Sequence, residues 1–143
     1  MSKNLSTLKF ENYIVENVEF KANLNYSGEK REIDIDLDNS YHVEEDNFIS
    51  ILELEVFPKA EENDFPFNMK VKLIGLFKVD INEKDSVKNS FIEKNSITIL
   101  FPYLRSIVST YTANSNIGTT ILPPINVIKY LEEKKKGHKG DTL

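Results

Sequence analysis

The stretch Ile99-Leu-Phe-Pro-Tyr-Leu-Arg105 decides how the last third of the chain folds. Three bulky apolar residues precede Pro102, and a proline is best tolerated in the first turn of a helix, where its missing N–H costs no hydrogen bond. Behind it, apolar residues recur at the spacing of one helical face, at Leu104, Ile107, Val108 and Tyr111. These features predict a helix that begins at Pro102 and packs its apolar face against the rest of the protein.

A second helix is expected after a polar spacer. Pro123 and Pro124 interrupt the chain, and Asn126 stands where it can cap the next helix. The residues that follow leave this helix little polar surface: Val127, Ile128, Tyr130 and Leu131. A helix that is apolar nearly all round is usually buried on two sides. The alternative is a helix that closes over a groove for apolar guests, and the sequence leaves both interpretations open.

The earlier part of the chain alternates with a period of two, which is typical of half-buried strands. Ile33, Ile35 and Leu37 alternate with three aspartates. Further strands are expected over residues 18–24, 48–57 and 67–81. Gly75 lies inside the last of these, where a glycine marks a bulge or a close approach of another backbone.

The order of these elements predicts an α+β fold. The connections over residues 27–30, 39–47 and 58–64 are too short for the crossovers that parallel strands need. A polar connection with a short helix over residues 86–92 separates the strands from the helices. We expect a four-stranded antiparallel sheet followed by two C-terminal helices packed on one face. The 143 residues suit a single domain, with flexible ends over residues 1–15 and 137–143.

The composition excludes several classes of protein. Apolar residues make up 40% and charged residues 29% of the chain, which is typical of a globular protein. No cysteine is present, which excludes disulfides, thiolate catalysis and cysteine zinc sites. A net charge of −5 argues against nucleic-acid binding. No run approaches the ~20 apolar residues that span a membrane, and the N-terminus lacks an apolar signal core, so we expect a soluble cytoplasmic protein.

Candidates for catalysis are few. The two histidines are His42, expected in an exposed loop, and His138, in the polar tail. The acidic residues around Asp64 lack the glycine and the alternating oxygen ligands of a calcium loop. No dinucleotide-binding, phosphate-binding, nucleophile-elbow or zinc-protease motif occurs. The sequence therefore predicts no catalytic residue, no metal site, no cofactor and no enzymatic activity.

Several ordered motifs resemble the SecB family of export chaperones. The stretch Ile99-Leu-Phe-Pro-Tyr-Leu-Arg105 is similar to the family's helix-start motif, and Leu122-Pro-Pro-Ile-Asn126 to its Leu-Ala-Pro-Val-Asn segment. Glu32-Ile-Asp-Ile-Asp-Leu-Asp38 resembles the family's second strand, and Gly75-Leu-Phe77 its Gly-Ile-Phe element. The resemblance implies a small acidic chaperone that forms a tetramer, built as a dimer of dimers, and holds unfolded preproteins in long apolar grooves.

The resemblance also implies which residues bind a guest polypeptide. Ile33, Ile35 and Leu37 match apolar positions that hold clients, and Ile128 and Leu131 match the helix that flanks the groove. Each apolar side chain that a client buries contributes roughly 1.5–3 kcal/mol, so a few distributed contacts give affinity without sequence specificity. We therefore expect an ATP-independent holdase that acts in protein export. The same alternating strand could instead simply face the core.

Three positions predict a weakened contact with the SecA motor. The family contacts SecA through acidic sheet positions, which are Asn17, Lys21 and Lys70 in this chain, and a reversed charge lowers the on-rate and specificity of an interface. One alternative is therefore a dedicated chaperone or adaptor for a single partner, for example an antitoxin, without delivery to SecA. Another is a small-ligand binder with a pocket beneath the last helix.

Overall fold

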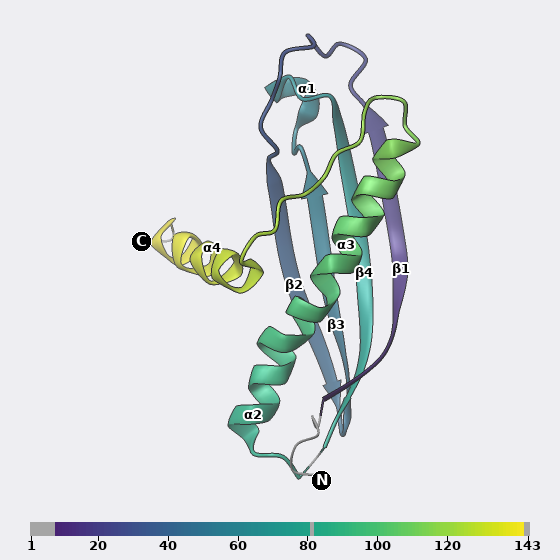
Figure 1. Ribbon diagram of the computed structural model, residues 1–143. Coiled ribbons are helices and arrows are strands. Elements are labelled where there is room, and N and C mark those ends of the chain that lie inside the picture. The colour runs from purple at the N-terminus through teal and green to yellow at the C-terminus, as the bar shows by residue number, and fades with distance from the viewer. Residues whose placement is uncertain (1–7, 81, 142–143) are drawn as a thin grey trace.

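The computed structural model describes residues 8–80 and 82–141, and its four strands form one antiparallel sheet (Figure 1). The sheet has the order β1-β4-β3-β2. Its strands are β1 (Leu8–Ala22), β2 (Ile35–Glu44), β3 (Asn47–Val56) and β4 (Phe67–Val79). The crossover connection, residues 23–34, carries the chain from β1 to the opposite edge. The first two strands are therefore both edge strands and do not pair with each other.

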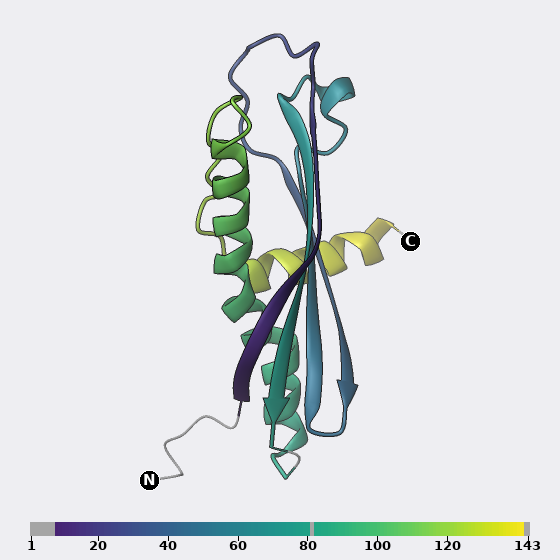
Figure 2. The same ribbon diagram turned by 90° about the vertical axis from the view of Figure 1, so that its right-hand side faces the viewer.

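The helices follow the strands along the chain, except for a single turn. The turn, α1 (Ala60–Asn63), lies between β3 and β4. Helix α2 (Asp85–Ser90) continues through a π-helical turn (Phe91–Asn95) into α3 (Ser96–Ala113), and α4 (Val127–Asp141) ends the described chain. Figure 2 shows α3 along one face of the sheet, which we call the helix-covered face, while α4 passes the edge formed by β2. The α+β prediction is confirmed.

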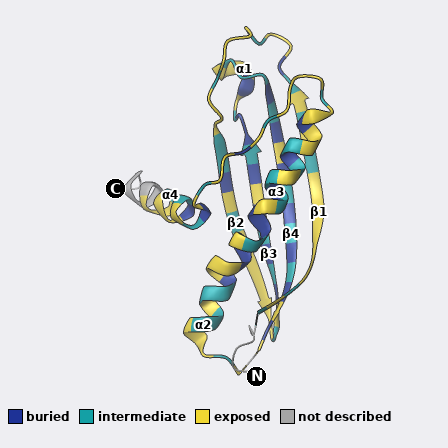
Figure 3. Cartoon of the chain, in the orientation of Figure 1, coloured by how far each residue is buried: buried dark blue, intermediate teal, exposed yellow. Residues whose placement is uncertain are grey.

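The core lies between α3 and the helix-covered face. Alternate residues of β3 and β4 are buried there, so dark blue and lighter positions alternate along both strands (Figure 3). Phe48 and Phe77 stack with their ring centroids 5.0 Å apart. Leu52, which interrupts the expected alternation of β3, is fully buried, and the neighbouring Ile51 points to the opposite face. We call this opposite side of the sheet the open face.

Gly75 lies at a close approach, but the approaching group is a side chain of α3 and not, as was expected, another backbone. A Cβ atom at this position would lie 2.7 Å from both terminal methyl groups of Leu100 on α3 and 2.8 Å from Phe77. Leu100 is fully buried, so its side chain has little room to move. Beside this contact the buried Ser96 hydroxyl donates to the Ile92 carbonyl at 2.7 Å and lies 3.0 Å from the Ser50 hydroxyl. These contacts seat the first half of α3 on the middle of the sheet.

The expected helix start at Pro102 is wrong, because Pro102 lies inside α3. The apolar face already begins with Ile97 and Leu100, and burial of those side chains holds the upstream turns in helical form. Pro102 and Thr98 are both exposed. The Thr98 carbonyl, which loses its N–H partner because residue 102 is proline, therefore faces water rather than the core.

Three other boundaries differ from those expected. Strand β1 begins at Leu8, so residues 8–15 are not a flexible end, and Leu8 and Phe10 pack against the hydrophobic core. His42 lies in β2 rather than in a loop, since the strand continues to Glu44. At the other end, α4 extends to Asp141, beyond the expected boundary at residue 137. Residues 1–7 and 142–143 lie outside the described part of the chain.

Candidate polypeptide-binding site

The strand expected to hold guests runs from an exposed start to a buried middle. Ile33 lies just before β2 and is 37% exposed, whereas Ile35 is half-buried and Leu37 is 0% exposed. Leu37 belongs to the hydrophobic core, where its burial stabilises the fold. In the folded chain, Ile33 and Ile35 are therefore accessible from outside and Leu37 is not.

Helix α4 lies against the part of β2 that contains Leu37. The Asn126 side chain accepts a hydrogen bond from the Lys129 backbone N–H at 3.0 Å, which confirms Asn126 as the N-cap of this helix. The Tyr130 hydroxyl accepts from the Leu37 backbone N–H at 3.2 Å and donates to the Ile35 carbonyl at 3.4 Å. The helix therefore binds backbone groups at the free edge of the sheet.

Lys134 makes the second attachment of α4. Its ammonium group donates to the Leu37 carbonyl at 3.1 Å and pairs with Asp36 at 2.6 Å and Asp38 at 2.7 Å. Burial lowers the pKa of Lys134, but the hydrogen bonds and the charges of the two aspartates outweigh it, so the pKa is raised. The aspartates that alternate with the apolar residues of β2 thus anchor the last helix.

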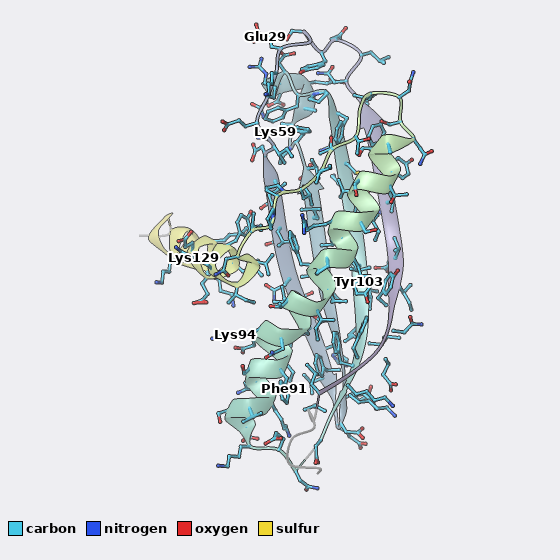
Figure 4. The ribbon with its side chains drawn as sticks, in the orientation of Figure 1. Glu29, Lys59, Phe91, Lys94, Tyr103 and Lys129 are labelled. Atoms are coloured by element: carbon cyan, nitrogen blue, oxygen red, sulfur yellow. The ribbon has the colours of Figure 1, made fainter. Side chains whose placement is uncertain are left out.

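Ile128 and Leu131 line a small cavity between α4, β2 and the π-helical turn. It has a volume of about 80 Å³, and Tyr41 and Ile97 complete its apolar wall. Leu131 is buried and Ile128 is half-buried, so only part of this pair is accessible from outside. Figure 4 shows the side chains of Lys94 and Lys129 on the side of the molecule from which α4 projects. The cavity has room for one small side chain.

The crossover connection that carries Ile33 is fixed by Asp64. The Asp64 carboxylate accepts from the backbone N–H of Ser27 at 2.9 Å, from the Ser27 hydroxyl, and from the Arg31 guanidinium at 2.6 Å. The hydrogen bonds from Ser27, and then that from Arg31, lower the pKa of Asp64 to about 2. Ile33 therefore lies two residues after Arg31, whose bond to Asp64 fixes this segment.

Apolar side chains also remain exposed on the α3–α4 linker, residues 114–126. Ile121 is 65% exposed, although Leu122 beside it is buried. The Arg105 guanidinium donates to the Leu122 carbonyl at 3.0 Å and fixes this part of the linker to α3. Figure 1 shows the linker running across the helix-covered side of the sheet toward β2. No sequence pattern marks Ile121 as a candidate, because it follows a polar spacer and has no periodic neighbours.

A groove of about 760 Å³ lies between the end of β1 and the second half of α3. Its apolar wall consists of Phe20, Ile107 and Tyr111, with the rings of Phe20 and Tyr111 5.4 Å apart. Sequence reasoning assigned Ile107 and Tyr111 to a core-facing stripe, but Tyr111 is 45% exposed. Figure 4 shows Tyr103 farther along, between α3 and β1.

The three positions linked to SecA lie together on the open face. Asn17 is opposite Lys72 in the sheet, Lys21 is opposite Asn68, and Lys70 lies between Glu19 and Glu55. The Lys72 pKa is raised by its hydrogen bond and charge interaction with Glu16, 3.0 Å away. The part of the open face around Lys70 therefore carries interspersed lysines and carboxylates and is not an acidic surface.

No group of three or more histidine, cysteine, aspartate or glutamate side chains within residues 8–80 and 82–136 is arranged to hold a metal ion. None of the helices in the described part of the chain is long and apolar enough to cross a membrane.

Known proteins are similar to this chain in sequence and in fold. An uncharacterised protein of Methanocaldococcus jannaschii is 43% identical over 126 residues, which cover 84% of this chain and 79% of that protein. The Mycobacterium tuberculosis Rv1957 SecB-like chaperone, solved with a ChAD peptide from the HigA1 antitoxin, superposes with a TM-score of 0.67 at 10% identity. That match covers 84% of this chain and 88% of the other.

A protein of unknown function from Streptococcus agalactiae superposes with a TM-score of 0.50, also at 10% identity, over 82% of this chain and 97% of that one. The family described as preprotein translocase subunit SecB matches residues 7–137. The matched region contains the whole sheet, α3 and the attachment of α4 to β2. Together these findings support a chaperone role, and the chain belongs to the SecB family.

Proposed function

We propose that this protein is an ATP-independent holdase that binds unfolded or aggregation-prone polypeptides, including preproteins. The observation that carries the proposal is the exposure of apolar side chains on the two irregular segments at the end of the sheet. Leu24 is 93% exposed, and Ile33, Ile117 and Ile121 are also exposed. We call these four residues the client surface. We propose that these exposed side chains act together as the apolar surface on which a client is held.

A holdase needs apolar area rather than exact hydrogen bonds, because it must accept many sequences. Burial of each isoleucine against a client contributes roughly 1.5–3 kcal/mol, so two or three contacts give useful affinity. Ile35 and Ile128, both half-buried, extend the client surface toward α4. Leu37 and Leu131 lie beneath it, and we propose that they act by supporting the accessible residues.

The test is light scattering from a refolding, aggregation-prone client. We expect the protein to lower the scattering, and the double variant Ile33→Asp with Ile121→Asp to lose most of this effect while remaining folded. Thr119→Asp is the matched control, because it adds a charge to the same linker at an exposed polar position. A wild-type protein that has no effect on several clients, even in excess, would contradict the proposal.

A second candidate is a dedicated chaperone or adaptor for one partner, such as an antitoxin. The Rv1957 SecB-like chaperone, whose structure resembles this chain, was solved with an antitoxin peptide. The interspersed lysines and carboxylates around Lys70 also favour weak contact with SecA. The family contacts SecA through acidic positions, and complementary charge governs the on-rate of such an interface. A pull-down from native lysate separates the candidates: one stoichiometric band favours the adaptor, whereas many bound polypeptides favour the holdase.

A further inference from the structure

The open face of the sheet carries apolar side chains in its middle. In the register of the strands, Ile74 lies opposite both Ile14 and Ile51, and Leu76 lies opposite Ile49. Opposite residues of an antiparallel pair share a face, and Ile51 points to the open face, so all five side chains lie there together. We call these five residues the open-face patch. Ile14 is 49% exposed, and the other four are half-buried.

No helix of the described residues lies across this patch. Helix α3 covers the other face of the sheet, and α4 stands beyond the edge formed by β2 (Figures 1 and 2). The face of an antiparallel sheet that is not packed on the core is usually polar. A contiguous apolar patch on such a face is typical of a surface that contacts another molecule.

The rows of residues beside the patch carry charge in a regular arrangement. Lys72 lies opposite Glu53, and Lys70 lies opposite Glu55, on the same face as the patch. The lysines therefore stand on β4 and the glutamates on β3. The side chains of Lys72 and Glu53 are 3.8 Å apart and are 36% and 58% exposed. Both charges can thus also reach a molecule that covers the open face.

This arrangement is self-complementary. If a second copy lies face to face with the first, with a two-fold axis along the strands between β3 and β4, β4 of each copy lies over β3 of the other. Apolar residues of β4 then meet apolar residues of β3, and Lys72 meets Glu53 of the second copy. A two-fold contact between identical chains requires such a surface. Stacked sheets lie about 10 Å apart and cross at about 30°, so the match is best near the patch.

We propose that the open face binds the open face of a second copy of this chain, with Ile74 against Ile51 and Lys72 against Glu53. This contact is separate from one on the side of β1 and α3, and it goes beyond the proposed holding of polypeptides. Five apolar residues make a small interface, so the association is weak and depends on concentration. It also covers the three positions linked to SecA, and a partner that docks there must displace the second copy.

A concentration series tests whether the patch associates. Sedimentation equilibrium should show a mass that rises with the concentration of the wild-type protein. Ile74→Thr should weaken this association about tenfold, because the lost apolar area counts twice in a two-fold contact. Val43→Thr is the matched control, since Val43 is 44% exposed on the other face. A wild-type mass that stays constant, or equal association by Ile74→Thr, would overturn the inference.

Paired charge variants test the occupant. Lys72→Glu leaves only carboxylates at the centre of the contact, and Glu53→Lys leaves only ammonium groups there. Each variant alone should not associate, because like charges meet, whereas an equimolar mixture should associate more tightly than the wild type. Mixing cannot repair a defect within one chain, so this recovery would identify a contact between chains.

Lys94→Glu mixed with Glu62→Lys is the control for that mixture. These exposed residues lie away from the open face, and the pair carries the same changes of net charge. The control mixture should not associate. A mixture of Lys72→Glu with Glu53→Lys that associates no better than the control would overturn the inference.

Light scattering from a refolding client separates this inference from the proposed function. A protein that pairs through the open face but does not suppress aggregation retains the inference and loses the proposed function. If Ile74→Thr abolishes suppression and leaves the mass unchanged, the patch holds clients, and the second copy is the wrong occupant. Tyr111→Asp, on the other side of the sheet, should retain the rise of mass with concentration, and loss of that rise would overturn the separation of the two contacts.

Discussion

The carboxylate of Asp64 joins two connections that are far apart in the sequence. It accepts hydrogen bonds from Ser27 and Arg31 of the crossover connection, while its own backbone carbonyl accepts from the Arg31 guanidinium at 3.0 Å. Asp64 itself has a positive φ of 55° at the end of α1, a conformation that aspartate tolerates better than most residues. A single side chain thus holds the segment that leads to Ile33.

We predict that Asp64→Asn reduces the acid sensitivity of the fold. The folded pKa of Asp64 lies near 2, below the ordinary value of 3.8, so the unfolded chain binds more protons between these limits. The stabilisation is complete above about pH 4 and is lost as the pH falls toward 2. In the variant, this part of the pH dependence of the free energy of unfolding should disappear, as measured by urea denaturation at several pH values.

Glu62→Gln provides the control for that experiment, because Glu62 is exposed in the same connection and has no ion-pair partner in the described part of the chain. It should retain the wild-type pH dependence. Identical pH profiles for Asp64→Asn and the wild type would contradict the role assigned to the carboxylate.

At the scale of the element, α3 shows how packing overrides a local signal. Proline favours the first turn of a helix, yet the buried side chains of Ile97 and Leu100 extend α3 upstream of Pro102. The π-helical turn that precedes Ser96 joins α2 to α3 without a break. The position of the first buried apolar residue, rather than the proline, therefore sets the path of this helix.

We predict that Pro102→Ala stabilises the protein by roughly 2 kcal/mol. Alanine restores the N–H that can bond to the Thr98 carbonyl and gains about 3 kcal/mol of helix propensity, from which up to about 1 kcal/mol is subtracted for the more flexible unfolded chain. Chemical denaturation measures the change. Ser106→Ala, at an exposed position of the same helix, should alter stability by less than about 0.5 kcal/mol.

A destabilised Pro102→Ala variant would contradict this expectation. It would mean that the bend imposed by proline is needed for α3 to follow the twisted sheet. A change in the far-ultraviolet circular dichroism of the variant would separate a gain of helix from a change in packing.

At the scale of the whole molecule, apolar side chains lie beside the free edge of β1. Tyr13 and Val15 are exposed on this strand, and the groove formed by Phe20 and Tyr111 lies at its end. Tyr13 and Tyr103 pack with their ring centroids 4.4 Å apart, so the apolar surface continues from β1 onto α3. The proposed client surface lies on other segments, so we expect the contact between subunits of a tetramer on this side of the sheet.

We predict that the protein is a tetramer, as its family resemblance implies, and that Tyr111→Asp yields a smaller species. A carboxylate buried in an apolar interface would lose its hydration without gaining a partner. Size exclusion coupled to light scattering measures the mass of both proteins. Thr119→Asp is the control and should leave the mass unchanged. A wild-type monomer at micromolar concentration would contradict the prediction.

The sequence by itself determined the kinds of element and their faces. The alternation of β2, the helical stripe after Leu104 and the cap at Asn126 depend only on neighbours within one or two turns, so local patterns are sufficient to reveal them. The order of these local elements likewise predicted the α+β class. The glycine at position 75 indicated only a crowded place in the strand, and the side chain that crowds it comes from the distant α3. The resemblance of several motifs then indicated the family.

Only the tertiary structure decided which apolar side chains are accessible from outside. Local periodicity shows that Leu37 lies on the apolar face of its strand, but it does not show what covers that face. Helix α4 lies against this part of β2, and the α3–α4 linker, which crosses the sheet, places it there. The contacts of Tyr130 and Lys134 join residues more than ninety positions apart, so they depend on the order of the strands and the path of the linker. That long-range arrangement leaves Ile33 and Ile121 exposed, buries Leu37 and keeps part of the β2 edge unpaired.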